Sequence, residues 1–236
     1  MYKYLIFDLD DTLTDDYENC KIAFTITLNS IGEEFTLEKF LRFREIDKDT
    51  WDKRSKGLLK TPFEDNKEKM IEWIRASRFM RFFGENTFSY DKFVEISNTY
   101  MHGMKEHVVA RPNAYEVIKY LHDKGYTLVI ATNGPLIPLE TKLNKLGIRE
   151  FINVVFSSEE VGVMKPNKEY FDGLLKKANI IDRSEVLFIG DDLQNDIQGG
   201  MQNNLDTCWC NYKNMTPNEY KPKYEITKLV EIKDIL

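Results

Sequence analysis

The second half of the chain alternates between two hydrophobic patterns, one typical of helices and the other of buried strands. The stretch RPNAYEVIKYLHDKG, residues 111–125, has apolar residues at helical spacing, with Pro112 near its start and Gly125 just past its end. Proline near a helix start and glycine after its end are the usual arrangement. The continuous apolar run YTLVIATNG comes next, and its lack of alternation indicates a strand buried on both faces, as in a parallel sheet.

The same alternation continues toward the C-terminus and predicts the remaining elements. We expect helices over about 138–146, 167–179 and 193–202, and strands at NVVFSS, VLFIGDD and DTCWC. The opening YKYLIF should join the same sheet, and YEITKLVEIKDIL should form a short extended piece and a closing helix. Strands that alternate with helices over short loops predict a doubly wound α/β fold with a mainly parallel sheet.

Residues 15–107 have a different pattern, with no convincing strand. Their apolar residues recur at helical spacing, and helix breakers separate the segments. The apolar positions include Phe40, Phe43, Ile46, Met70, Trp73 and Ile74, and the breakers are Gly32, Gly57, Pro62 and Gly84. We therefore expect two domains: an α/β core from residues 1–14 and 108–236, and an all-helical domain, residues 15–107, inserted after the first strand.

Composition narrows the class of protein. The 236 residues are 42% hydrophobic and 31% charged, as in an ordinary globular protein, and no apolar run approaches the roughly 20 residues of a membrane helix. The net charge of −6 argues against binding a nucleic-acid polymer. Cys20, Cys208 and Cys210 form no disulfide framework, and the apolar N-terminal stretch is too short for a signal peptide. We expect a cytoplasmic protein with reduced thiols, either a monomer or a homodimer.

Polar and acidic residues gather where the predicted strands end. Ligands of open α/β sheets bind beyond the carboxyl ends of the strands, so these residues are candidates for one site. A crowd of carboxylates is costly to bury unless a cation compensates it. Asp8, Asp10 and Asp191 suit Mg²⁺, which prefers oxygen ligands and keeps several waters. The candidate phosphate-binding groups are Thr132, Lys165 and the backbone N–H groups near Asn133 and Gly134.

Four segments in this order resemble the four motifs of the haloacid dehalogenase (HAD) superfamily. They are DLDDT at 8–12, TNG at 132–134, Lys165, and GDDLQND at 190–196. Each is weak alone, but all four lie at or just beyond a predicted strand end. The helical insertion after the first motif is similar to that family's cap domain. The resemblance implies a Rossmann-like core and a Mg²⁺-dependent reaction on a small phosphate ester.

The resemblance also implies a role for each motif residue. Asp8 would be the nucleophile that forms an aspartyl-phosphate, and Asp10 the acid and base. Mg²⁺ would be held by the Asp8 carboxylate, the Asp10 backbone carbonyl and Asp191. Asp196 would act through water or behind the direct ligands. Asp192 stands where related proteins commonly have Ser or Thr, so its part at the metal stays open beside an ordinary role in the turn.

The residues also indicate a branch of the superfamily. Dehalogenases of this superfamily lack an aspartate at the position of Asp10, and transport ATPases carry threonine there. The helical insertion with ATNGP, GDDLQNDIQGG and FREIDKDTWDK resembles the branch of pyrimidine 5′-nucleotidases and N-acylneuraminate phosphatases. A nucleoside 5′-monophosphate, especially a pyrimidine one, is therefore the leading substrate. The alternatives are a sugar-phosphate phosphatase, a phosphomutase of the β-phosphoglucomutase kind, and a non-catalytic binding protein, which would not need all four motifs.

Two features of the helical insertion allow a second interpretation. Arg75, Arg78 and Arg81 are interleaved with phenylalanines and are expected to form a solvated helix face, the alternative being a basic stripe for a nucleotide. Trp51 is expected in the core of the helical domain, the alternative being a place beside the substrate.

Overall fold

The structure is a computed structural model that describes residues 1–63, 65–134, 136–216 and 219–236. Pro135 of the ATNGP stretch lies outside the described residues. The chain forms two compact units, one of residues Met1–Tyr17 with Val108–Leu236 and the other of Glu18–His107. We call them the sheet unit and the helical unit and describe each by itself.

The sheet unit is built on six parallel strands among its described residues. Their order across the sheet is β3-β2-β1-β4-β5-β6, and every neighbouring pair is parallel. The strands are β1 (Tyr4–Phe7), β2 (Thr127–Thr132), β3 (Val154–Ser157), β4 (Val186–Gly190), β5 (Asp206–Cys210) and β6 (Tyr224–Ile226). The expected doubly wound α/β fold is confirmed.

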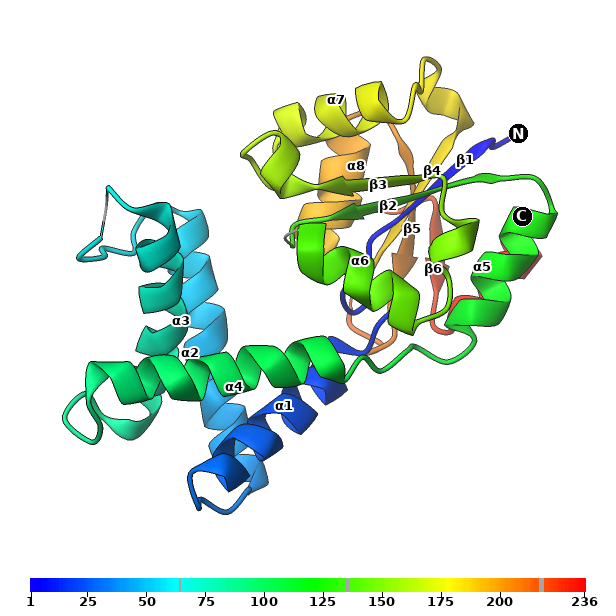
Figure 1. Cartoon of the computed structure of the whole chain (residues 1–236). Helices are drawn as coiled ribbons and strands as arrows, with labels where there is room; N and C mark the ends of the chain where they lie inside the picture. The colour runs from blue at the N-terminus through cyan, green and yellow to red at the C-terminus, as the bar shows by residue number, and fades with distance from the viewer. Residues whose placement is uncertain (64, 135, 217–218) are drawn as a thin grey trace. The chain divides into compact units, whose positions relative to one another are not determined.

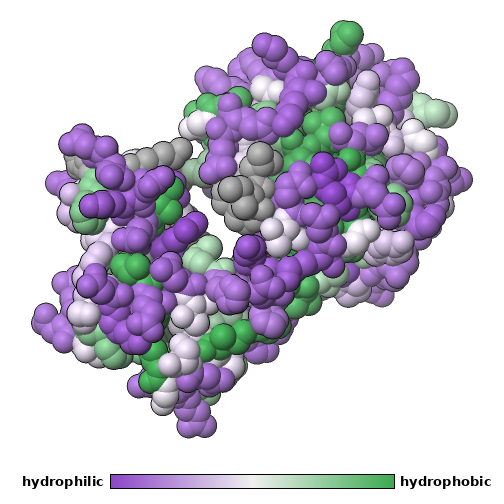
Figure 2. Space-filling model, in the orientation of Figure 1, coloured by the Kyte–Doolittle hydropathy of each residue, from purple (hydrophilic) through white to green (hydrophobic). Residues whose placement is uncertain are grey.

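Helices cover both faces of this sheet because the central strands are apolar on both sides. In β1, Leu5 and Phe7 pack into one hydrophobic cluster, whereas Ile6 packs into the other. Figure 1 shows α5 and α6 on one side and α7 and α8 on the other. The helices are α5 (Ala114–Asp123), α6 (Leu136–Lys145), α7 (Lys168–Lys177), α8 (Gly199–Gln202) and α9 (Ile232–Ile235). Hydrophilic residues cover most of the visible face of each unit (Figure 2).

One expected helix differs in detail. In place of a single helix over 193–202, a π-helical segment, Leu193–Gln198, precedes the short α8. The N–H of Ile197 donates to the Asp192 carbonyl, five residues earlier, at 3.2 Å. The Asp192 carboxylate accepts from the N–H groups of Gln194 and Asn195 and holds the first turn. This wide turn carries Asp196, whose position matters below.

The helical unit contains four helices, and its described residues include no strand. They are α1 (Asp16–Ser30), whose first two residues belong to the sheet unit, α2 (Leu37–Ser55), α3 (Lys67–Phe83) and α4 (Tyr90–Glu106). Thr36, Asn66 and Ser89 cap α2, α3 and α4 by accepting a backbone N–H. Stacked and edge-on aromatic rings form the core, including those of Phe24, Phe43, Phe79, Phe82 and Tyr100. None of the described helices combines the length and the apolar character needed to cross a membrane.

Candidate active site

The candidate site lies at the carboxyl ends of the central strands. Asp8 follows β1 directly, Asp191 follows β4, and Thr132 is the last residue of β2. Because β1 pairs with both β2 and β4, these three strand ends are neighbours. The chain also changes direction across the sheet here, since β2 and β3 lie on one side of β1 and β4 to β6 on the other. Such a switch point is the usual ligand site of a doubly wound sheet.

The sequence-predicted site residues meet in one pocket of about 220 Å³ within the sheet unit. The pocket is lined by Asp8, Asp10, Asp11, Thr132, Asn133, Gly134, Lys165, Asp191, Asp192, Asn195 and Asp196. Nine of these eleven residues are the candidates that the sequence analysis named; Asp11 and Asn195 are additions. The fold therefore brings four sequence segments to one place.

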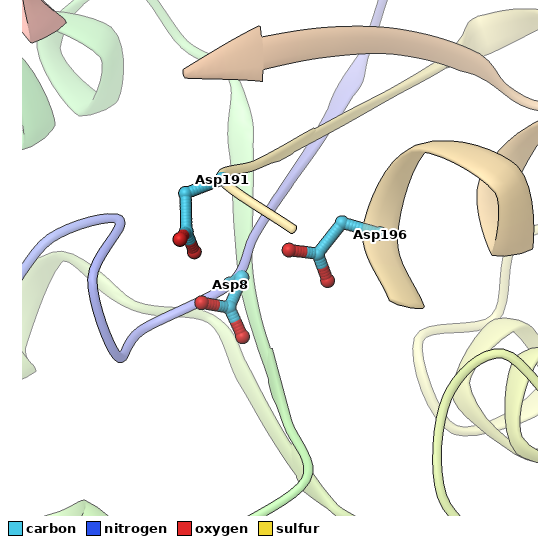
Figure 3. A group of neighbouring side chains, drawn as sticks. All are labelled: Asp8, Asp191 and Asp196. Carbon is cyan, nitrogen blue, oxygen red and sulfur yellow. The ribbon is translucent and has the colours of Figure 1, made fainter. Parts of the chain in front are cut away.

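Three carboxylates in this pocket form a group that fits a divalent cation. Asp8, Asp191 and Asp196 each offer one oxygen, and these oxygens lie within 4.8 Å of one another. Figure 3 shows the three side chains converging from the ends of β1 and β4 and from the turn after β4. Oxygen ligands of this kind match Mg²⁺. The group adds the Asp196 carboxylate to those of Asp8 and Asp191; the expected ligand from Asp10 is a backbone carbonyl and stays a prediction.

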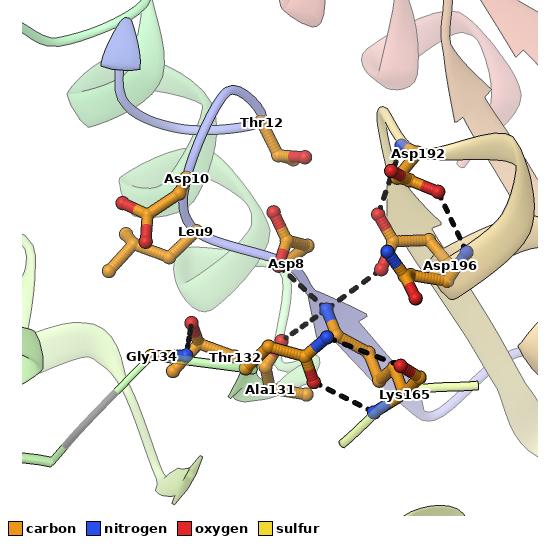
Figure 4. A network of polar contacts seen from close by, with 12 residues as sticks. Asp8, Leu9, Asp10, Thr12, Ala131, Thr132, Gly134, Lys165, Asp192 and Asp196 are labelled. Atoms are coloured by element: carbon orange, nitrogen blue, oxygen red, sulfur yellow. Dashed lines mark hydrogen bonds and ion pairs between the residues drawn. The ribbon is translucent and has the colours of Figure 1, made fainter. Parts of the chain in front are cut away.

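Lys165 is buried among these acids, and its side chain is only 2% exposed. Its ammonium donates to Asp8 Oδ1 at 2.7 Å, to Asp196 Oδ1 at 2.7 Å and to the Ala131 carbonyl at 3.0 Å (Figure 4). An ammonium has three hydrogens, so each has an acceptor. Lys165 therefore neutralises part of the negative charge from inside the protein.

The TNG segment holds Lys165 in place. Asn133 Oδ1 accepts the Lys165 N–H at 2.7 Å, and Asn133 Nδ2 donates to the Lys165 carbonyl at 3.3 Å. The Asn133 side chain thus binds the backbone of the lysine. The Gly134 N–H donates to Thr132 Oγ1 at 2.9 Å. This pairing engages one of the backbone N–H groups expected to bind phosphate, while the Thr132 hydroxyl keeps its own hydrogen to donate.

Asp10 lines the same pocket as Asp8, Asp191 and Asp196, but it pairs with a lysine other than Lys165. Its carboxylate forms an ion pair with Lys142 of α6 and accepts from Thr14 Oγ1 at 3.4 Å. The Asp10 side chain is 36% exposed, much more than that of Asp8 at 10%. Figure 4 shows the Asp10 carboxylate apart from the Asp8–Lys165–Asp196 contacts. Sequence reasoning missed Lys142, because nothing in the helical pattern of α6 distinguishes this lysine from a solvated one.

Asp196 is held by its own turn. The Asp192 N–H donates to Asp196 Oδ2 at 3.1 Å, while the Asp192 carboxylate is engaged by the turn's N–H groups. A Cβ on Gly190 would overlap the Asp196 carboxyl group. Only glycine at 190 lets this acid approach the strand end. Asp192 thus has the structural role in the turn that the sequence analysis kept as one alternative.

Burial and mutual repulsion make the acids hard to ionise. Burial, with the charges of Asp196 and Asp10, raises the pKa of Asp8 to about 7, although Lys165 opposes this change. Burial and then the charges of Asp8 and Asp196 raise the pKa of Asp191 well above its usual range. Burial likewise raises the pKa of Asp196, again against the effect of Lys165. A bound cation would favour the ionised forms.

Comparisons with known proteins agree with this geometry. The family model described as "Haloacid dehalogenase-like hydrolase" matches residues 5–210. HAD-hydrolase YfnB of Bacillus subtilis is 30% identical over 237 residues, which cover 100% of this chain and 95% of that protein. A crystal structure of YfnB bound to magnesium has a TM-score of 0.85 at 28% identity, covering 100% of this chain and 98% of the other.

Two relatives carry more specific names. Pyrimidine 5′-nucleotidase YjjG of Escherichia coli is 27% identical, with 100% of this chain and 98% of that protein covered. A glyceraldehyde 3-phosphate phosphatase of Pyrococcus abyssi is 29% identical, with 90% and 82% covered. The family match spans most of the chain, and the fold and the four motif segments agree with it. The chain belongs to the haloacid dehalogenase-like hydrolases.

Proposed function

We propose that this protein is a Mg²⁺-dependent phosphomonoesterase that acts through an aspartyl-phosphate on Asp8. The observation that carries the proposal is the Asp8 carboxylate at the end of β1, in contact with Lys165 and grouped with Asp191 and Asp196. A nucleophilic carboxylate beside a cation site and a buried ammonium can approach a phosphate dianion without prohibitive repulsion. Asp8, Asp191 and Asp196 would hold the metal, which supplies neutralisation of charge on the phosphoryl oxygens.

The residues divide the reaction into two steps. In the first, an Asp8 oxygen forms a bond to phosphorus, the ester P–O bond breaks, and protonated Asp10 gives its proton to the leaving oxygen. In the second, the Asp10 carboxylate takes a proton from water as the water oxygen bonds to phosphorus. The Asp8–phosphorus bond then breaks and inorganic phosphate leaves. Lys165 and the Thr132 hydroxyl donate hydrogen bonds to the phosphoryl group.

The substrate class rests on the relatives. The name of YjjG supports a pyrimidine nucleoside 5′-monophosphate, in agreement with the sequence resemblance to that branch. The second candidate is a sugar phosphate, which the name of the glyceraldehyde 3-phosphate phosphatase supports. A phosphomutase is the third, since it would use the same aspartyl-phosphate and return the phosphoryl group to its substrate.

A phosphate-release screen separates these functions. Purified protein is incubated with UMP, dTMP, purine monophosphates and several sugar phosphates, with Mg²⁺ and with chelator. We expect the highest kcat/KM on a pyrimidine monophosphate, and Asp8→Asn protein prepared identically controls for a contaminating phosphatase. Highest kcat/KM on sugar phosphates would replace the substrate assignment, and isomerisation of a sugar phosphate without phosphate release would identify a mutase. Equal phosphate release by the Asp8→Asn control would remove the proposal.

Magnesium is expected to stabilise the protein more at pH 8 than at pH 5. The folded pKa of Asp8, about 7, lies above its unfolded value of 3.8, and that of Asp191 is also raised. A raised carboxyl pKa stabilises the fold below the unfolded value, and this stabilisation is lost as pH rises through the folded one. The metal-free protein therefore loses stability between about pH 4 and 8. A Mg²⁺ concentration a hundredfold above the Kd at pH 8 restores about 2.7 kcal/mol there, and the same concentration stabilises less at pH 5, where protonation weakens binding.

Thermal unfolding with Mg²⁺ and with chelator at both pH values measures this difference. Asp191→Asn protein serves as the control and should lose most of the Mg²⁺ effect. A Tm increase that is equal at pH 5 and pH 8 would contradict the origin of the effect in these carboxyl groups.

Lys142→Met is expected to lower kcat roughly ten- to a hundredfold with little change in KM. The ion pair with Lys142 orients the Asp10 carboxylate, and proton transfer depends steeply on that position. Lys142→Arg keeps a cation in reach and should recover part of the rate. Lys145→Met, on the same helix, is the matched control. An unchanged kcat in folded Lys142→Met protein would show that Asp10 needs no such partner.

A further inference from the structure

Two arginines of the helical unit have no anionic partner among the described residues. Arg54 lies in the last turn of α2 and Arg75 in the middle of α3, and neither forms an ion pair or side-chain hydrogen bond with any described residue. The other two members of the arginine series on α3 are paired. Arg78 Nη1 contacts Asp47 Oδ1 at 2.7 Å, and Arg81 Nη2 contacts Asp49 Oδ2 at 2.7 Å.

The expectation that these arginines form a solvated face of α3 is wrong for Arg78 and holds for Arg81, which is exposed. The Arg78 side chain is only 3% exposed and lies over the rings of both Trp51 and Tyr100. Arg54 and Arg75 are partly buried, and the Nε of Arg75 is shielded from solvent without a hydrogen-bond acceptor. The interleaved phenylalanines account for the buried arginine. Phe79 and Phe82 are buried, so α3 is packed over more of its circumference than a surface helix, and Arg78 lies within the packed part.

These cations are poorly compensated. Burial, followed by the charges of Arg78 and Arg54, lowers the pKa of Arg75, and burial lowers that of Arg54. Asp47 is the acid that pairs with Arg78, and it also accepts from the Trp51 indole, so it does not neutralise the other two. Guanidinium groups stay protonated even in such places, and a buried donor without an acceptor is costly. The helical unit thus retains charge that weakens its own fold.

Trp51 forms a flat wall beside these arginines. The Arg54 guanidinium lies 5.0 Å from its ring centroid and that of Arg78 lies 5.7 Å away. Trp51 Nε1 donates to Asp47 Oδ1 at 3.0 Å, which fixes the ring. The Trp51 indole therefore contacts Arg54, Arg78 and Asp47, and its signal should respond to a ligand that binds beside these arginines.

We propose that Arg54 and Arg75, beside Trp51, form a binding site for an oxyanion, the phosphate or carboxylate group of a small molecule. Guanidinium groups present planar sets of donors that match both groups. A bound oxyanion would neutralise the two charges. Its oxygens would also accept hydrogen bonds from the guanidinium N–H groups that have no acceptor among the described residues. Residues that weaken a fold yet suit a ligand are typical of binding sites. Its residues belong to the helical unit, and the inference does not depend on the phosphatase proposal.

The test uses the three tryptophans of the full chain as reporters. Protein labelled with ¹⁵N-tryptophan is titrated with inorganic phosphate and, separately, with citrate, at constant ionic strength and with chelator present. Trp→Phe variants assign the indole signals. Trp209 Nε1 donates to the Asp191 carbonyl and therefore reports on the catalytic pocket, whereas Trp51 reports on the arginine site. The experiment thus distinguishes a loss of anion binding beside Trp51 from a loss of binding in the pocket near Asp191.

We expect a saturable shift of the Trp51 signal. A shift with phosphate identifies a phosphate group as the ligand, a shift with citrate identifies a carboxylate group, and a shift with both shows that the site accepts either. Arg54→Gln and Arg75→Gln should weaken this binding at least tenfold, as loss of a charge-assisted hydrogen bond predicts. Arg42→Gln, an exposed position on α2, should leave it unchanged. No saturable Trp51 shift with either anion, or equal affinity in Arg54→Gln and Arg75→Gln, would overturn the proposal.

A stability measurement tests the same inference without a ligand. Because Arg75 is uncompensated, Arg75→Gln should keep or raise the Tm of the anion-free protein, whereas Arg78→Gln should lower it by breaking the buried pair with Asp47. A Tm that falls as far in Arg75→Gln as in Arg78→Gln would show that Arg75 is a structural residue, against the proposal.

Discussion

Asp8→Asn is expected to reduce phosphomonoesterase activity by a factor on the order of ten thousand or more, to the background of the assay. Asparagine has almost the same shape but no nucleophilic oxygen, so the phosphoryl group has no acceptor on the protein. The substitution also removes one of the three neighbouring carboxylates, which belong to Asp8, Asp191 and Asp196. Phosphate release from the best substrate of the screen measures the effect.

The fold should survive this change. Asparagine removes a buried negative charge that raises the pKa of Asp191, although Lys165 then loses one of its two carboxylates. Circular dichroism and thermal unfolding establish that the variant is folded. Asp11→Asn is the matched control, since Asp11 lines the same pocket but pairs with Arg111. Turnover near wild type in folded Asp8→Asn protein would exclude Asp8 as nucleophile.

Lys165→Met is expected to cost about 3–5 kcal/mol of unfolding free energy in metal-free protein, the range for a buried ion pair that loses one partner. The ammonium lies between Asp8 and Asp196, whose side chains are 10% and 2% exposed. Methionine fills a similar volume but leaves the two acids facing each other. Urea unfolding of both proteins in chelator measures the difference.

The double variant Lys165→Met/Asp196→Asn separates charge from packing. Removing one of the two acids should recover part of the lost stability, and added Mg²⁺ should stabilise the single variant by compensating both. If neither change restores stability, the loss arises from packing of the side chain. Activity should stay absent in both variants.

The fold and the pocket were largely predictable from local patterns. A continuous apolar run such as residues 126–131 identifies a buried parallel strand, and carboxyl ends of parallel strands meet at one edge of a sheet. Asp8, Thr132 and Asp191 could therefore be placed together without knowledge of side-chain geometry. Lys165 is not at a strand end, and it was included because the segment after the third predicted strand leads to it and a lysine suits a phosphate.

The partners of these side chains were not predictable, because they depend on residues distant in the sequence. Asn133 binds the backbone of Lys165 across 32 positions, and Lys142 reaches Asp10 across 132. The wide turn at 193–198 has the same helical pattern as an α-helix, so periodicity could not reveal it. Arg78 looks like a surface residue in sequence, and its burial depends on Asp47, an acid on another helix.

The saturated ammonium of Lys165 has a consequence for how a substrate enters. All three of its hydrogens are committed to Asp8, Asp196 and the Ala131 carbonyl. A phosphate oxygen gains a full hydrogen bond from this lysine only by displacing one of those acceptors. If it displaces Asp8 Oδ1, a lone pair of that oxygen would become free as the phosphorus of the proposed substrate comes within reach. On the proposed mechanism, the contact that holds the Asp8 carboxylate in place would therefore be the same contact that the substrate exchanges.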